Sequence, residues 1–236
     1  MTVTALFLDS AGVLFDKDKL MAEWPPRIGE FLAQQLGGDT AAWTQANAVA
    51  QREAWRRYEQ RMKKDGSRSG ARAFIAQDRV RWLLDVCDAV GITPPADAAV
   101  LAEDSARSAG SRVDAALPGA ADAVRALRAR LTLFTSSSQP SLELAAQLRA
   151  LGVRELFDRT YGPDLIDRWK SGPHYYEAIL KDAIVRPEAA ATVDDSPERL
   201  DWAKKAGLRT FVMTADPNRA GRHEAIGSLA DLLTRL

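Results

Sequence analysis

The sequence has little of what marks a secreted, membrane or nucleic-acid-binding protein. Among its 236 residues Cys87 is the only cysteine, which excludes an internal disulfide and suits a reducing compartment. Lysine plus arginine equals aspartate plus glutamate at 32 each, so no overall field favours nucleic acid or an anionic membrane. No apolar stretch reaches ~18 residues. No basic or long apolar segment precedes Asp9. We therefore expect a soluble, cytoplasmic protein without nucleic-acid or membrane partners, in which any phosphate site is local.

Most of the chain alternates between short apolar runs and helical patterns, as in parallel strands joined by helices. Strands are expected at 5–8, 131–134, near 160–161, 191–193 and 210–213. Helices are expected at 119–130, 141–151, 173–183, and from Ser196-Pro197 to Gly207, where a capping hydroxyl precedes proline. Residues 1–15 and 113–236 are therefore predicted to form a layered α/β core.

Residues 16–112 show no convincing strand. Long helical spacings are broken by turn signals at Gly37-Gly38, Asp65-Gly66-Ser67 and Thr93-Pro94-Pro95. We predict an all-helical insert of four helices. Its tryptophans and Cys87 are expected to pack between the helices, because large aromatic side chains and free cysteines are usually buried.

Acidic residues follow two of the expected strands. Asp9 comes directly after the apolar run at 5–8, and Asp194-Asp195 follow the run at 191–193. Ligands of open α/β sheets bind at the carboxyl ends of strands, so these acids are placed where chemistry usually occurs. Two adjacent acids need a compensating cation or base, and their hard oxygen ligands suit Mg²⁺.

Two further positions complete the pattern. Thr135 ends the strand expected at 131–134, and Ser136 follows it; hydroxyls and loop amides at a strand end can hold phosphate oxygens. Lys170 precedes the helix expected at 173–183, where its charge can neutralise an aspartate and a phosphoryl group. Each position has a plain alternative, as a turn or a solvated side chain, and only the order of all four along the chain is specific.

In this order and spacing, the sequence resembles the haloacid dehalogenase superfamily, which includes many phosphatases. The resemblance implies a Rossmann-like parallel-sheet core, with residues 16–112 as the helical cap. It also implies that Asp9 is the nucleophile, Thr135 the strand-end hydroxyl and Lys170 the charge-neutralising lysine, with Asp194 and Asp195 as the metal-binding acids. Leu117-Pro118-Gly119 and the pattern around Lys170, with Pro173 and Tyr176, fit the same family.

The resemblance implies a mechanism as well. Asp9 would attack phosphorus in line and form an aspartyl phosphate. Mg²⁺ would be held by Asp9, the carbonyl of Ala11 and the pair Asp194 and Asp195. The expected function is Mg²⁺-dependent hydrolysis of a small phosphorylated metabolite.

Ala11 departs from the family, which most often has a second Asp there to protonate the leaving group and then activate water. Such acid–base help is worth about 10² to 10⁴ in rate. One interpretation is that a cap residue, the substrate or a water replaces it, or that the leaving group needs little protonation. Asp16 could be proposed as the replacement acid, but its place at the hinge fits a structural role better.

Asp9 to Gly12 also resembles the nucleophile loop of phosphonoacetaldehyde hydrolase, which cleaves a carbon–phosphorus bond through an imine with a cap lysine. Imine formation needs a desolvated lysine. The candidate lysines, in a charged helix end and the hinge, do not fit that need: Lys63, Lys64, Lys17 and Lys19.

A third interpretation is a binding or regulatory protein that keeps the fold without turnover. The retained Asp9, Lys170 and Asp194-Asp195 argue against it, because such a protein has no evident reason to keep repelling acids together. A dehalogenase is less favoured, since those relatives work without metal and have no use for the acidic pair in this form.

Overall fold

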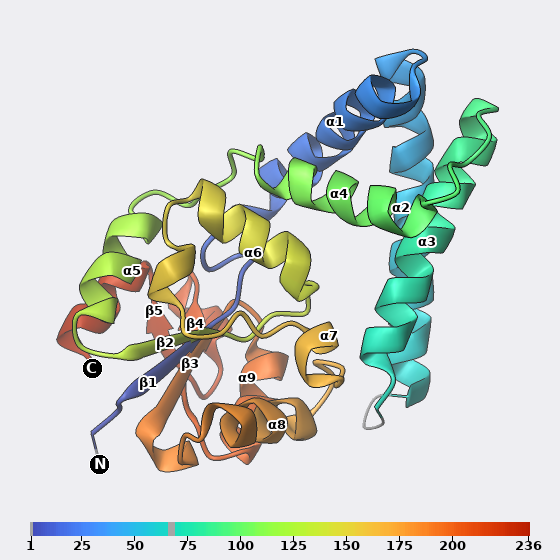
Figure 1. Cartoon of the computed structure of the whole chain (residues 1–236). Coiled ribbons are helices and arrows are strands. Elements are labelled where there is room, and N and C mark those ends of the chain that lie inside the picture. Colours follow the sequence, from blue (N-terminus) through green and yellow to red (C-terminus); the bar gives the residue numbers. More distant parts are fainter. Residues whose placement is uncertain (1, 66–68) are drawn as a thin grey trace.

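The computed structural model describes residues 2–65 and 69–236 (Figure 1). Gly66 and Ser67 of the predicted turn lie outside the described residues. Within the described chain, no helix combines the length and apolar character that a bilayer crossing requires.

The core is a parallel sheet, five-stranded in the described part of the chain, with the order β2-β1-β3-β4-β5. The strands are β1 (Ala5–Leu8), β2 (Thr132–Thr135), β3 (Ala190–Asp194), β4 (Arg209–Met213) and β5 (Glu224–Ile226). The first strand is thus paired on both sides, with Leu8 opposite Thr135 in β2 and Val193 in β3. This arrangement confirms the predicted α/β fold.

Helices cover both faces of this sheet, because side chains alternate along each buried strand. Leu6 and Leu8 pack with α5 (Ala120–Arg128) and α6 (Ser141–Ala150). Ala5 and Phe7 share a second cluster with α8 (Pro173–Ala183) and α9 (Pro197–Lys205). Short connecting elements complete the core: α7 (Pro163–Ile166), η1 (Arg154–Leu156), η2 (Pro187–Ala189), η3 (Pro217–Ala220) and η4 (Leu229–Thr234).

The predicted helical insert consists of α1 (Lys17–Leu36), α2 (Thr40–Asp65), α3 (Ala71–Val90) and α4 (Ala98–Gly110). In Figure 1 these helices gather beside the core, on the side toward which the chain leaves β1. They share an apolar cluster in which Trp43 and Cys87 are wholly buried, as predicted for both. Trp55 was expected to pack likewise, but 54% of it is exposed. We call these four helices the cap.

Polar contacts join the cap to α7 and α6. The carboxylate Oδ1 of Asp167 accepts hydrogen bonds from the backbone N–H groups of Gly70 (3.0 Å) and Arg72 (2.9 Å), so a core residue caps the start of α3. The Arg79 guanidinium in α3 lies 2.7 Å from the Glu143 carboxylate in α6. Burial raises the pKa of Glu143, and the charge of Arg79 opposes that rise.

Three details differ from the sequence-based expectations. Thr160 and Tyr161 form no strand; the backbone there makes one isolated bridge, from Arg159 to Phe134. Strand β5 was not predicted, because three residues with one glutamate give no apolar run. His223, in a polar C-terminal stretch whose sequence suggests exposure, is buried, with its Nδ1 2.8 Å from the Thr210 hydroxyl.

Candidate active site

The sheet brings Asp9 and Asp194 together. Asp9 follows β1 and Asp194 ends β3, and these strands are neighbours, with the backbone N–H of Asp9 donating to the Val193 carbonyl over 3.0 Å. Asp9 is 2% exposed and Asp194 is fully buried. Two carboxylates in such a place repel each other strongly unless cations compensate them.

Lys170 is the first compensating cation. Its Nζ lies 2.7 Å from Asp194 Oδ2 and 3.3 Å from Asp9 Oδ1, and it also donates to the Ser136 carbonyl. The side chain is completely buried, which an ammonium tolerates only with such partners. Lys170 therefore lies between the two acids.

Asp195 completes the group and approaches the loop after β1. A Cβ at Gly12 would lie 2.5 Å from Asp195 Oδ2, and Gly12 has a φ of +84°, so this position needs glycine. Lys17, in the first turn of α1, forms an ion pair with Asp195 Oδ2. Asp195 Oδ1 is buried without a hydrogen-bond partner.

Asp9, Asp194 and Asp195 form an acidic cluster in which one oxygen from each carboxylate lies within 4.8 Å of the others. That spacing and the unpartnered Asp195 Oδ1 fit a hard dication that takes oxygen ligands. Burial raises the pKa of Asp194 to about 6; the charge of Lys170 opposes the rise and that of Asp9 adds to it.

Arg199 was missed by the sequence-based reasoning. It lies in the first turn of α9, and its Nη1 is 3.4 Å from Asp9 Oδ2 and 4.0 Å from Asp194 Oδ1. Burial lowers the pKa of Arg199, but the carboxylates, Asp9 first, outweigh burial and raise it. The sequence offers only its position, four residues after Asp195 and in the first turn of a predicted helix, which many arginines share.

Thr135 and Ser136 lie beside the cluster with their hydroxyls engaged. Thr135 donates to the Tyr161 carbonyl over 3.1 Å, and the Ser136 hydroxyl lies 3.3 Å from that of Thr192. Both residues are buried. Their assignment to phosphate binding stays a prediction, and it requires these hydroxyls to rotate away from their present partners. In the structure, Ser136 contacts the cluster through its backbone carbonyl, which accepts a hydrogen bond from Lys170.

The cap contributes aromatic side chains. The Tyr58 hydroxyl in α2 donates to the Ser138 carbonyl in the loop after β2, over 3.0 Å. Its ring lies edge-on to Trp169, with centroids 5.2 Å apart. Trp169 precedes Lys170 and is fully buried, so cap contact extends to the residue next to the buried lysine. Burial raises the pKa of Tyr58 far above its ordinary value, which makes it a poor proton donor at neutral pH.

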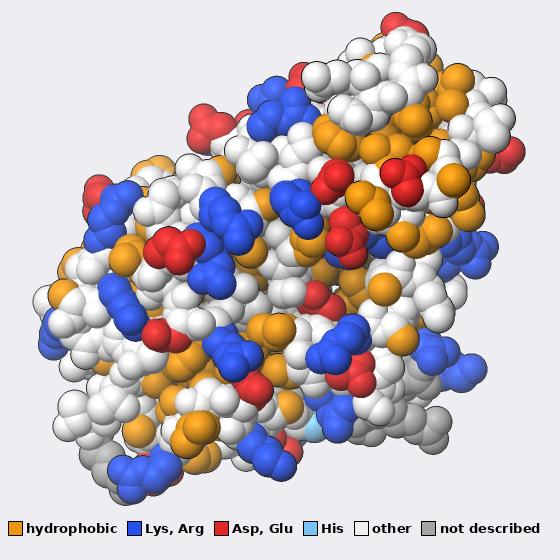
Figure 2. Space-filling view, in the orientation of Figure 1, with side chains coloured by type: hydrophobic (Ala, Val, Ile, Leu, Met, Phe, Trp, Pro, Cys, Tyr) orange, Lys and Arg blue, Asp and Glu red, His pale blue; other side chains and the backbone are white. Residues whose placement is uncertain are grey.

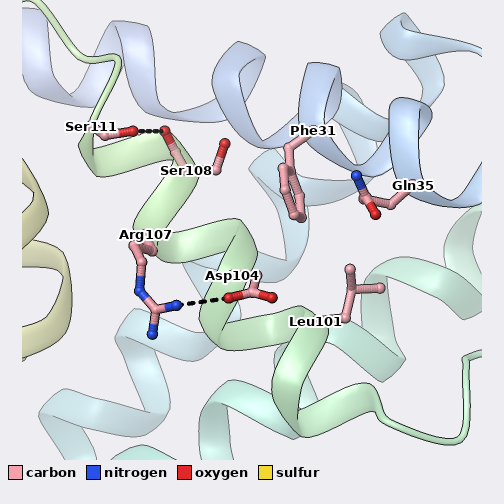
Figure 3. Close-up of a pocket in the computed structure, with 7 residues that line it drawn as sticks. All are labelled: Phe31, Gln35, Leu101, Asp104, Arg107, Ser108 and Ser111. Atoms are coloured by element: carbon pink, nitrogen blue, oxygen red, sulfur yellow. Dashed lines mark hydrogen bonds and ion pairs between the residues drawn. The ribbon is translucent and has the colours of Figure 1, made fainter.

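A recess on the cap surface is separate from this chemistry. It has a volume of about 380 Å³ and lies between α1, which contributes Phe31 and Gln35, and α4 (Figure 3). Arg107 and Asp104, which face it, pair with each other at 2.8 Å. No carboxylate of the acidic cluster lines it. On the face shown in Figure 2, the described acidic and basic side chains are interspersed.

Comparison with known proteins gives a family description for most of the chain. A family model described as haloacid dehalogenase-like hydrolase matches residues 3–207. Protein CbbY of Cereibacter sphaeroides is 36% identical over 120 residues, which cover 49% of this chain and 51% of CbbY. The phosphorylated carbohydrates phosphatase of Thermotoga maritima is 29% identical over 92 residues, 39% of this chain and 43% of that protein. The matches thus span about half the length of these curated relatives.

Solved structures show the same fold over the whole chain. The 2-haloacid dehalogenase from Pseudomonas syringae pv. Tomato DC3000 superimposes with a TM-score of 0.68, covers 99% of both chains and is 21% identical. At that identity the likeness concerns the fold alone, including the helices beside the sheet. It leaves the choice of reaction to the residues of the acidic cluster and its surroundings.

Proposed function

Since the chain belongs to the haloacid dehalogenase-like hydrolases, we propose that it hydrolyses a small phosphorylated metabolite with Asp9 as the nucleophile. The observation that carries this proposal is the position of Asp9, buried at the carboxyl end of β1 with Lys170 on one oxygen and Arg199 on the other. The phosphatase named among the relatives supports the substrate class.

Asp9 would act by covalent catalysis. One carboxylate oxygen attacks phosphorus, the oxygen–phosphorus bond to the leaving group breaks, and an aspartyl phosphate forms. Water then attacks phosphorus, which releases inorganic phosphate and restores the carboxylate. Lys170 and Arg199, already within 3.4 Å of Asp9, offset the negative charge on the phosphoryl oxygens in both steps.

The acidic cluster would hold Mg²⁺, with the Ala11 carbonyl as a further ligand. The three converging carboxylates and the unpartnered Asp195 Oδ1 support this assignment. When bound, the ion supplies Lewis-acid compensation of phosphoryl charge. Asp194 is buried and forms an ion pair with Lys170, so it positions that lysine whether or not the ion is present.

The leaving group would be one that departs without a proton. Ala11 has no acidic side chain, and the raised pKa of Tyr58 makes it a poor substitute. Asp16 is occupied as the N-cap of α1, where it accepts from the Lys19 N–H over 3.0 Å. We therefore favour an aryl or acyl phosphate over a simple alkyl phosphate.

The test is a series of aryl phosphates whose leaving-group pKa values differ, assayed with and without Mg²⁺ and with Asp9→Asn as the blank. The expected result is turnover that needs both Mg²⁺ and Asp9, with a rate that falls steeply as the leaving-group pKa rises, since no group protonates the departing oxygen. A flat dependence would refute the leaving-group argument. Equal rates for Asp9→Asn and the parent would exclude Asp9 as the nucleophile.

None of the four candidate lysines supports the phosphonoacetaldehyde hydrolase interpretation. Lys19, Lys63 and Lys64 are exposed, and Lys17 is ion-paired with Asp195. An ammonium in an ion pair has no free lone pair for an imine. Phosphonoacetaldehyde nevertheless belongs in the substrate panel, because its hydrolysis would restore this interpretation directly.

Carbon–halogen hydrolysis is a second candidate, favoured by one observation. A halide leaves without a proton, so Ala11 is no handicap, and Arg199 compensates Asp9 without a metal ion. The acidic pair Asp194 and Asp195 still argues for the phosphoryl reaction, since a metal-free dehalogenase has no use for it. Halide release from 2-chloropropionate that persists in a chelator would reverse this order.

A further inference from the structure

Arg199 and Lys170 contact the same two acids from opposite sides. Lys170 Nζ approaches Asp9 Oδ1 and Asp194 Oδ2, whereas Arg199 Nη1 approaches Asp9 Oδ2 and Asp194 Oδ1. Each carboxylate therefore has one oxygen committed to lysine and one facing arginine. The oxygens that face arginine are the pair which Lys170 leaves for a metal ion.

The two cations differ in their freedom to move. Lys170 is completely buried and also donates to the Ser136 carbonyl, so its side chain cannot rotate toward solvent. The side chain of Arg199 is 29% exposed, and its contacts with Asp9 and Asp194, at 3.4 Å and 4.0 Å, are longer than a strong ion pair. Arg199 can leave the acidic cluster by rotating toward solvent, while its backbone stays in α9.

The charges within the cluster balance without a metal ion. Three carboxylates face three cations, Lys17, Lys170 and Arg199. Alanine at position 11 removes the side chain that would have added a further negative charge in this loop. A dication that enters the cluster while Arg199 remains would meet a neutral group of side chains and a neighbouring positive charge, which disfavours binding.

We propose that Arg199 is a counter-ion built into the cluster, which competes with the divalent cation for Asp9 and Asp194. When the cation binds, the guanidinium turns away, and its planar set of donors is then free for the anionic group of the substrate. This inference rests on the proposed function, because it concerns the same cluster. It adds that cation binding and substrate-anion binding share one residue, so each strengthens the other.

The test is direct titration of Mg²⁺ by calorimetry, without substrate, into the parent, Arg199→Gln and Lys204→Gln. Lys204 is the matched control, since it is exposed on the same helix and its loss changes the net charge equally. The expected result is a Mg²⁺ dissociation constant at least about tenfold lower in Arg199→Gln, with Lys204→Gln close to the parent. Equal or weaker binding by Arg199→Gln would overturn the proposal.

Thermal unfolding gives a second readout that does not depend on activity. In a chelator, Arg199→Gln should melt below the parent, because two acids lose a partner, and Mg²⁺ should raise its melting temperature more than that of the parent. A variant that melts lower and gains no more from Mg²⁺ than the parent would mean that Arg199 is only structural, which also overturns the proposal.

The two proposals fail in different ways. If the parent hydrolyses no phosphate ester but Arg199→Gln binds Mg²⁺ more tightly, the counter-ion role stands and the proposed function falls. If the parent is a Mg²⁺-dependent phosphatase and Arg199→Gln binds Mg²⁺ no more tightly, the proposed function stands and the counter-ion role falls.

Discussion

The core half and the cap half of the candidate site use different physical chemistry. The core half is a set of buried charges, in which Lys170 Nζ lies 3.3 Å from Asp9 and 2.7 Å from Asp194. The cap half is aromatic, with Tyr58 packed on Trp169 and hydrogen-bonded to the loop after β2. Charges at the end of a sheet are fixed by strand register, whereas the cap contact depends on two helices and a loop that meet over long sequence distances.

This difference predicts that a substitution in the core half lowers the free energy of unfolding more than a substitution in the cap half. A buried charge without its partner costs several kcal/mol, while the loss of one hydrogen bond between neutral groups costs about 1 kcal/mol. Substitutions in the core half and in the cap half therefore measure separately what each half contributes to stability.

Lys170→Met should have the largest effect. It leaves Asp9 and Asp194 buried without their shared partner, so we expect a loss of about 3–5 kcal/mol in the free energy of unfolding, together with loss of activity. Urea denaturation in a chelator measures the first. Lys181→Met, an exposed lysine in α8, is the control. A change below about 1 kcal/mol would refute the account of the core half as a set of mutually dependent charges.

Ala11→Asp should change the reaction and not the fold. It restores an acid beside Asp9, and we expect turnover of an alkyl phosphate to rise by about 10²- to 10⁴-fold. The rate for an aryl phosphate with an acidic leaving group should change far less. Ala11→Asn, which has the same shape without the acid, serves as the control. No gain for the alkyl phosphate would show that the pocket, not the missing acid, limits the reaction.

The pH dependence of stability should reflect Asp194. Its pKa is raised from 3.8 to about 6, so the folded state binds a proton more readily than the unfolded state. The resulting stabilisation is full below pH 3.8 and is lost as the pH rises through about 6. In a chelator, the parent should lose up to about 3 kcal/mol across this window relative to Asp194→Asn. Parallel stability curves for the two proteins would contradict the shift.

Asp167→Gly tests a second contact between the core and the cap, and should have the smallest effect. It removes the carboxylate that caps α3, at an expected cost of about 0.5–2 kcal/mol. Glycine adopts the positive φ of 53° at this position without added strain, so any loss of stability comes from the missing carboxylate. Asp167→Asn keeps a capping oxygen and should stay close to the parent. If both variants lose the same free energy of unfolding, the negative charge of Asp167, and not a capping oxygen as such, stabilises this contact.

The sequence predicted most strands of the core well, because apolar runs followed by polar residues identify both the strands and their carboxyl ends. The helix at 197–205 was predicted from Ser196 and Pro197, and that helix positions Arg199. Arg199 itself was missed, because an arginine in the first turn of a helix has no distinctive pattern until the opposing acids are seen in three dimensions. Tyr58 and Trp169 could not be paired, since no local periodicity links α2 to the loop before α8. The strand expected near Thr160 was wrong because two polar-flanked residues are too few for their pattern to decide.

The central place of β1 has a consequence for biosynthesis. This strand, Ala-Leu-Phe-Leu, leaves the ribosome well before its neighbours β2 and β3, which begin at Thr132 and Ala190. Both of its edges therefore wait unpaired while more than half of the chain is made, and an apolar strand with free edges is prone to wrong pairing. The whole cap is synthesised within that interval, so its helices can fold before the sheet that they will face exists. Completion of β3 then pairs the second edge of β1 and brings the acidic cluster together, before β4 and β5 extend the sheet.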